Sequence, residues 1–287
     1  MTDEKAARLA ALRAANSTRR QTDTPQAKPV IQRLDAGKVP EQAVHAGTDP
    51  ELFTELPPAM APQAVLGMLF AAIIGALSAI IVLPGWLPGL SASLVGAEPQ
   101  ASWYLSRSSA FVAYILLWLA MISGLLITNK LARAWPGGPT AFDLHQHTSL
   151  LGLAFAMFHG LILLGDRYVQ ATLEQILVPF HYTGYEAAWV GLGQIAFYGM
   201  AMVGLSYYVK ERIGRRLWRL VHFLSFVVFA LALAHGVWSG SDSQTDMARV
   251  LYWSSGTSVL FLTIYRILVS IVKRTGSTRS TAPMRHS

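Results

Sequence analysis

Six long apolar stretches follow one another along this chain. They cover residues 64–83, 109–128, 145–164, 187–208, 217–238 and 250–272. Each has about the 20 residues that a helix needs to cross the hydrocarbon core of a bilayer. Charged residues make up only 14% of the chain, against about a quarter in soluble proteins. Because helices satisfy their own backbone hydrogen bonds in lipid, we predict an all-α integral membrane protein built as a six-helix bundle.

Basic residues mark one set of ends of these stretches. Lys and Arg gather in the N-terminal tail, in the loops after the second and fourth stretches and in the C-terminal tail, whereas the alternate loops hold one each. Positive residues favour the cytoplasmic side, so both termini are predicted to be cytoplasmic. The same distribution accounts for the net charge of +7. We therefore expect membrane lipid around the chain and no nucleic-acid partner.

Composition divides the chain into three parts. Residues 1–62 are polar and lack apolar periodicity, so we predict a mostly disordered cytoplasmic tail. Residues 63–272 form the membrane domain, and residues 273–287 form a short basic tail. We expect a multi-pass protein of the bacterial cytoplasmic (inner) membrane.

The absence of cysteine narrows the chemistry. The chain contains none, which excludes disulfides, iron–sulfur clusters held by thiolates and haem attached through thioether bonds. A redox cofactor in this chain would therefore need other ligands.

Four histidines lie within two of the apolar stretches. His145 and His159 are in the third stretch, and His222 and His235 are in the fifth. Ionisable side chains at membrane depth are costly and favour a functional interpretation. The predicted topology makes both stretches run the same way, which gives two facing pairs at two depths. Two imidazoles can ligate one haem iron from opposite sides, so we predict iron ligation by all four histidines.

The spacing of the histidines supports two sites but leaves one geometric problem. Fourteen residues separate the first two histidines and thirteen separate the second two, which is roughly 20 Å along a helix in both cases. Fourteen residues return to nearly the same helix face, whereas thirteen leave the two side chains about 140° apart. We therefore predict either a local distortion in the fifth helix or different approach angles to the two haems.

Three further residues are candidate cofactor contacts. Gly160 and Gly236 each follow the second histidine of their stretch, and glycine lets a flat ring approach the backbone closely. Ordinary small-residue packing of membrane helices is the alternative. Arg266 lies in the sixth stretch, where a haem propionate or, alternatively, lipid phosphate would satisfy its charge.

Two other histidines are weaker candidates. His147 is out of phase with His159, so we expect it to cap a helix or lie at the interface, with alternate ligation or a propionate contact as the other interpretation. His181 lies in the predicted outer loop between the third and fourth stretches. We expect it to be a surface residue, or else to lie above the outer haem where an acceptor docks.

The residues that enter and leave the fifth stretch carry a family resemblance. Residues 214–222 read GRRLWRLVH, an apolar run follows, and residues 235–238 read HGVW. With the histidine spacing, this resembles the ferric reductase-like transmembrane domain, a superfamily that includes NADPH oxidases, ferric-chelate reductases and the haem membrane subunit of the periplasmic methionine sulfoxide reductase system. The resemblance covers residues 65–272. It implies two b-type haems between helices 3 and 5, with His145 paired to His222 and His159 to His235.

The chain departs from that family after its last stretch. The oxidases and ferric reductases carry a flavin- and nicotinamide-binding module there, whereas fifteen residues follow Val272 and no G-x-G-x-x-G fingerprint follows a strand. We therefore expect FMN or FAD only on a partner protein. The expected electron donor is a cytoplasmic flavoprotein or membrane quinol, and the expected acceptor is a ferric chelate, oxygen, flavin or a periplasmic redox protein.

The leading hypothesis is transmembrane electron transfer by a di-haem cytochrome b, which makes the chain an oxidoreductase or its membrane subunit. A transporter or proton relay that uses the histidines as titrating groups is the main rival, and it predicts a colourless protein. A haem-containing anchor subunit of a redox complex is a third interpretation.

Overall fold

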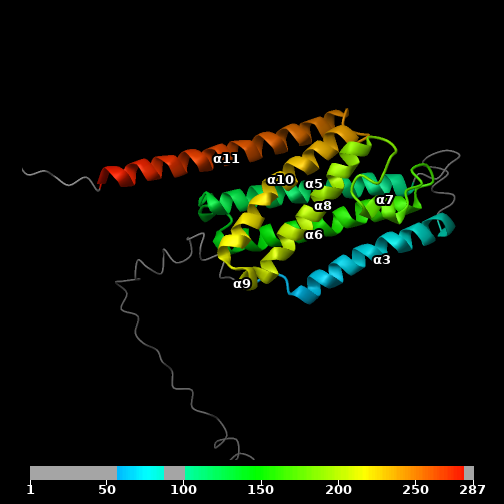
Figure 1. Cartoon of the computed structure of the whole chain (residues 1–287), viewed down its shortest axis with the longest axis horizontal. Helices are drawn as coiled ribbons and strands as arrows, with labels where there is room; N and C mark the ends of the chain where they lie inside the picture. The colour runs from blue at the N-terminus through cyan, green and yellow to red at the C-terminus, as the bar shows by residue number, and fades with distance from the viewer. Residues whose placement is uncertain (1–56, 87–100, 281–287) are drawn as a thin grey trace, which may run out of the picture. The chain divides into compact units, whose positions relative to one another are not determined.

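The computed structural model describes residues 57–86 and 101–280 of the 287-residue chain (Figure 1). Within these ranges every regular element is a helix. The long ones are α3 (Pro62–Trp86), α5 (Ala101–Thr128), α6 (Gly138–Leu161), α8 (Ala187–Ser206), α10 (Arg215–Ser239) and α11 (Asp246–Ser280). The short ones are η2 (Leu131–Arg133), η3 (Ile162–Gly165), α7 (Leu173–Leu177), η4 (Tyr207–Val209) and α9 (Lys210–Ile213). Among the described residues, six helices are long and apolar enough to span a bilayer, so the chain is a multi-pass integral membrane protein, as predicted.

α5 and α11 extend furthest beyond the predicted apolar stretches. α5 begins at Ala101 because its polar first turns find partners in the protein. Arg107 Nε donates to Asp242 Oδ2 at 2.6 Å, and its guanidinium carbon lies 4.0 Å from the centre of the Trp103 ring. α11 continues to Ser280, into the predicted C-terminal tail. The predicted N-terminal tail lies outside the described residues except for 57–62.

The helices associate mainly in pairs. α5 packs closely along α6, and α8 packs closely along α10, while α3 lies against α6 and α11 lies against α5 (Figure 1). The main buried apolar cluster consists of Tyr114, Leu117, Met121, Leu125, Phe229 and Val259, from α5, α10 and α11. The α5–α6 pair and the α8–α10 pair each contribute one histidine-bearing helix.

Polar side chains join α11 to α5. The Tyr114 hydroxyl and the Ser255 hydroxyl lie 2.6 Å apart, and Trp118 Nε1 donates to Ser258 Oγ at 2.9 Å. Lipid cannot satisfy such groups, so hydrogen bonds between spanning helices hold them together. These contacts fix α11 beside α5.

Candidate cofactor site

The four histidines form two pairs between α6 and α10. The ring centres of His145 and His222 lie 6.0 Å apart with planes at 70°, and those of His159 and His235 lie 6.2 Å apart with planes at 66°. We call the first two the basic-end pair, because they lie in the first half of α6, which follows Lys130 and Arg133, and of α10, which starts with Arg215 and Arg216. The other two are the far-end pair. The structure therefore brings together the histidines that the sequence predicted to face each other.

Backbone carbonyls of neighbouring helices hold three of the four rings. Nδ1 of His145 donates to Ala120 O at 2.8 Å, Nδ1 of His159 to Ser106 O at 2.8 Å, and Nδ1 of His235 to Trp189 O at 3.0 Å. A carbonyl oxygen can only accept, so Nδ1 carries the proton and Nε2 keeps its lone pair. Histidines that ligate metals are oriented in this way by a hydrogen bond at the other ring nitrogen.

Two glycines open these carbonyls to the imidazoles. Gly124 is four residues after Ala120, and Gly193 is four residues after Trp189. A helical Cβ tilts toward the N-terminus, so a side chain at that position would cover the carbonyl one turn earlier. A Cβ on Gly124 would lie 3.1 Å from His145 Cε1, and a Cβ on Gly193 would lie 2.5 Å from His235 Nδ1. The absence of a side chain at these two glycines therefore leaves the space that the His145 and His235 rings occupy.

Serines add to the support of the far-end pair. Ser106 Oγ lies 2.8 Å from His159 Nδ1 and donates to His159 O at 3.0 Å. Ser239 Oγ lies 3.0 Å from His235 Nδ1. In the basic-end pair, the Ser123 hydroxyl lies at a longer 3.5 Å from His145 Nδ1. Ser106 is buried, so its hydroxyl has lost water as an alternative partner.

Trp218 supports His222 by stacking rather than by hydrogen bonding. The two rings lie 5.2 Å apart at 28°, one turn apart on α10. The Trp218 indole N–H is buried and has no acceptor within the described part of the chain. An unpaired buried donor costs about 1–3 kcal/mol. It therefore marks a place where a bound group with an acceptor would fit.

α10 accommodates the thirteen-residue spacing without a break. It is one continuous α-helix from Arg215 to Ser239, so the expected local distortion is not present in its secondary structure. The two histidines meet different neighbours instead. His222 lies against Trp218 of its own helix, whereas His235 reaches the backbone of α8.

The geometry of each pair fits one metal ion between its rings. Two metal–imidazole bonds of about 2 Å, plus the distance from each bonded nitrogen to its ring centre, separate the centres by roughly 6 Å. Edge-to-face packing also gives roughly 4.5–7 Å, so the separation alone does not distinguish the two cases. The Nδ1 hydrogen bonds of His145, His159 and His235 leave Nε2 unprotonated in those three rings, as a metal ligand requires. All four rings are half-buried rather than fully packed, and the residues present thus fit a planar metallocofactor.

The two glycines predicted to contact the cofactor face protein atoms. A Cβ on Gly160 would lie 3.5 Å from Ile176, which belongs to α7. A Cβ on Gly236 would lie 3.0 Å from the Tyr252 hydroxyl of α11. Close packing accounts for both glycines, and their contact with a cofactor stays a prediction.

The other predicted residues have partners of their own. Arg266 donates to Thr128 O, at the C-terminus of α5, at 2.9 Å, where a cation also favours the helix dipole. Its contact with a propionate stays a prediction. His147 is exposed, and its Nδ1 bonds Asp143 O of the same helix at 2.8 Å. His181 is also exposed, with Nε2 3.5 Å from Glu174.

Sequence reasoning missed several supporting residues. Ser239 and Trp218 lie four residues from a histidine on the same helix, and that spacing could have revealed them. Ser106 and Gly124 lie on α5, and nothing in the spacing along one helix identifies a neighbour on another.

Comparisons with known proteins add no second line of evidence on this site. Comparisons of the chain with protein-family models, with curated proteins and with solved structures found no match. Within the described ranges, no group of three or more His, Cys, Asp or Glu side chains could hold a metal ion. The candidate site therefore consists of two pairs, and the family resemblance stays a prediction.

Proposed function

We propose that this protein is a di-haem cytochrome b that carries electrons across a membrane, with one b-type haem ligated by each histidine pair. The observation that supports it best is a repeated geometry. Both pairs have ring centres about 6 Å apart, and both contain an imidazole whose Nδ1 is bonded to a carbonyl. When bound, each porphyrin iron supplies reversible one-electron transfer.

The chain's own residues set the depth and orientation of both sites. Thirteen residues of unbroken α10 separate His222 from His235, which is roughly 20 Å along the helix. The hydrocarbon core is roughly 30 Å thick, so two sites at this separation bring each face within reach of one of them. The carbonyls of Ala120, Ser106 and Trp189 fix ring direction, and the surrounding apolar helices keep water from the ligands.

The charge distribution supports an orientation of the two pairs, and the direction of transfer is part of the proposal. The basic-end pair lies at the end predicted to be cytoplasmic, and the far-end pair at the outer face of a bacterial inner membrane. Electrons enter at the basic-end pair from a flavoprotein or membrane quinol. They leave at the far-end pair to a ferric chelate, oxygen, flavin or a periplasmic redox protein.

Haem content per chain tests the proposal directly. We expect the full chain, purified in lipid nanodiscs, to contain two b-type haems by the pyridine haemochrome assay. His159→Ala and His222→Ala should each lose one of them. His147→Ala is the matched control, since this exposed residue bonds only its own helix, and it should keep both. A colourless protein would refute the proposal and favour a proton relay.

A further inference from the structure

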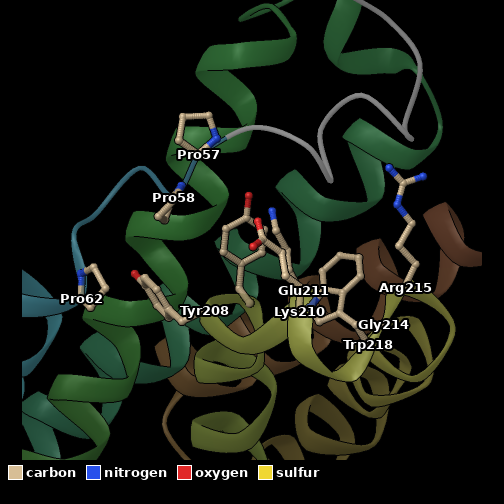
Figure 2. A pocket seen from close by; sticks show the side chains of 10 residues that line it. Pro57, Pro58, Pro62, Tyr208, Lys210, Glu211, Gly214, Arg215 and Trp218 are labelled. Carbon is tan, nitrogen blue, oxygen red and sulfur yellow. The ribbon is translucent and has the colours of Figure 1, made fainter.

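A cavity of ≈ 790 Å³ lies at the basic end of the bundle. Its walls come from the segment before α3, from η4 and α9, and from the first turn of α10 (Figure 2). Ligand sites in proteins commonly measure about 300–1,000 Å³. The cavity is therefore large enough for a ring-shaped ligand and part of a chain attached to it.

The cavity is one side chain away from the basic-end pair. Trp218 lines the cavity and also stacks on His222, with ring centres 5.2 Å apart. Tyr207, another wall residue, packs edge-on against Trp218 at 6.2 Å. A molecule in the cavity would thus have aromatic rings between itself and a histidine proposed to ligate iron.

The position and the walls suit a ligand that arrives from the bilayer. The cavity lies where the spanning segments Ala187–Ile213 and Arg215–Ser239 meet, which places it at the membrane boundary. The wall formed by the segment before α3 and its first residue is apolar. It includes Pro57, Pro58 and Pro62, which have no backbone N–H group that needs a hydrogen-bond acceptor. The Tyr208 hydroxyl donates to Met60 O at 2.9 Å and thereby holds this wall to η4.

The charged wall residues indicate a ligand that ionises. Lys210 and Arg215 line the cavity together with Glu211, and Lys210 Nζ lies 3.8 Å from the centre of the Tyr207 ring. Two cations and one carboxylate on the same side suit a ligand that can give up a proton and then carry a negative charge. A phenolic ring can lose a proton to that carboxylate, while the two cations stabilise the resulting phenolate.

We infer that the cavity is a quinol oxidation site with Glu211 as the proton acceptor, an inference that rests on the proposed di-haem function. A haem held by His145 and His222 would accept the two electrons of each quinol one at a time, the first passing on toward the far-end pair before the second arrives. The two O–H bonds of the quinol break, and the ring leaves as a quinone. Glu211 is exposed, so it passes the first proton to water and can then accept the second.

Photolabelling locates the site without relying on haem. The full chain in nanodiscs is illuminated with an azido-quinone, and the labelled peptides are identified by mass spectrometry. We expect labelling within residues 57–62 and 207–218, abolished by excess decylubiquinol. His145→Ala should still be labelled, because it changes the opposite member of the pair and leaves Trp218 and His222 in place. Labelling elsewhere, or protection by flavin mononucleotide rather than by decylubiquinol, would overturn the inference.

Reduction kinetics test the role of Glu211. With decylubiquinol as the donor under anaerobic conditions, Glu211→Gln should slow haem reduction by roughly a hundredfold, the low end for a positioned general base. Dithionite should reduce the variant as fast as the parent protein. Glu174→Gln, which removes an exposed carboxylate on α7, is the matched control. An unchanged rate in Glu211→Gln contradicts the inference, whereas a protein without haem contradicts the proposed function and leaves the labelling result to stand alone.

Discussion

The two histidine pairs are alike in spacing but differ in how they are supported. In the far-end pair both imidazoles donate to a backbone carbonyl, and a serine hydroxyl lies within 3.0 Å of each Nδ1. In the basic-end pair one imidazole donates to a carbonyl and the other stacks on Trp218. The far-end pair is therefore the more rigidly held.

The surroundings of the far-end pair are also more closely packed than those of the basic-end pair. Trp189 and Trp238 stack at 4.4 Å and 13° beside the far-end pair and tie α8 to α10. The basic-end pair lies beside the ≈ 790 Å³ cavity. A site that only passes electrons onward benefits from fixed ligands, whereas a site that receives them from an exchanging molecule needs room next to it. This difference leads to four predictions.

The largest effect is expected from Gly193→Ala. The new Cβ would lie 2.5 Å from His235 Nδ1, so the ring must move away from the Trp189 carbonyl. We expect loss of most of the far-end haem and a destabilisation of about 1–3 kcal/mol from overpacking. Haem content and thermal unfolding would measure both. Gly124→Ala, whose new Cβ would lie 3.1 Å from the nearest His145 atom, should retain more haem than Gly193→Ala. Gly204→Ala, which like Gly193 lies on α8, is the control and should retain both haems.

Trp218→Phe tests whether a group bound at the basic-end pair accepts a hydrogen bond from the Trp218 indole. The variant keeps an aromatic ring against His222 but removes the unpaired indole N–H. If a bound haem accepts a hydrogen bond from that N–H, the variant should release the basic-end haem faster by roughly tenfold, equivalent to about 1.4 kcal/mol. Haem transfer to an acceptor protein would measure this rate. A slower dissociation would mean that nothing accepts the N–H.

Ser106→Ala should have a smaller effect, confined to the far-end pair. It removes the hydroxyl contacts with His159 but keeps the carbonyl that holds Nδ1. A hydrogen bond contributes about 1 kcal/mol, so we expect a modest loss of stability and a shift in the potential of one haem only. Spectroelectrochemical titration would resolve the two haems. Ser123→Ala, at the longer 3.5 Å contact, should leave both potentials nearly unchanged.

Tyr114→Phe should have the smallest effect and should not distinguish the pairs. It removes the hydroxyl 2.6 Å from Ser255, between α5 and α11. Such hydrogen bonds average about 0.6 kcal/mol between membrane helices, so unfolding in detergent should be slightly easier. Two haems with unchanged spectra are expected. A change in either haem would mean that α11 positions the histidines.

The long helices were predictable, whereas their exact starts were less so. Continuous hydrophobicity predicted six spanning segments, and the described residues contain six helices long and apolar enough to span a bilayer. The start of α5 was missed because Arg107 and Ser106 are polar, and only their partners Asp242 and His159 explain why they lie in a helix. The partners are 135 and 53 residues away in the chain, beyond the reach of local pattern.

The sequence by itself determined the membrane class and the four histidines, because hydrophobicity and ionisable residues at membrane depth are properties of single segments. It also indicated which histidines face each other, through their position along helices that run in the same direction. Only the tertiary structure decided how each ring is held. The carbonyls of Ala120 and Trp189 become accessible where Gly124 and Gly193 lie one turn later, and that depends on the approach of one helix to another.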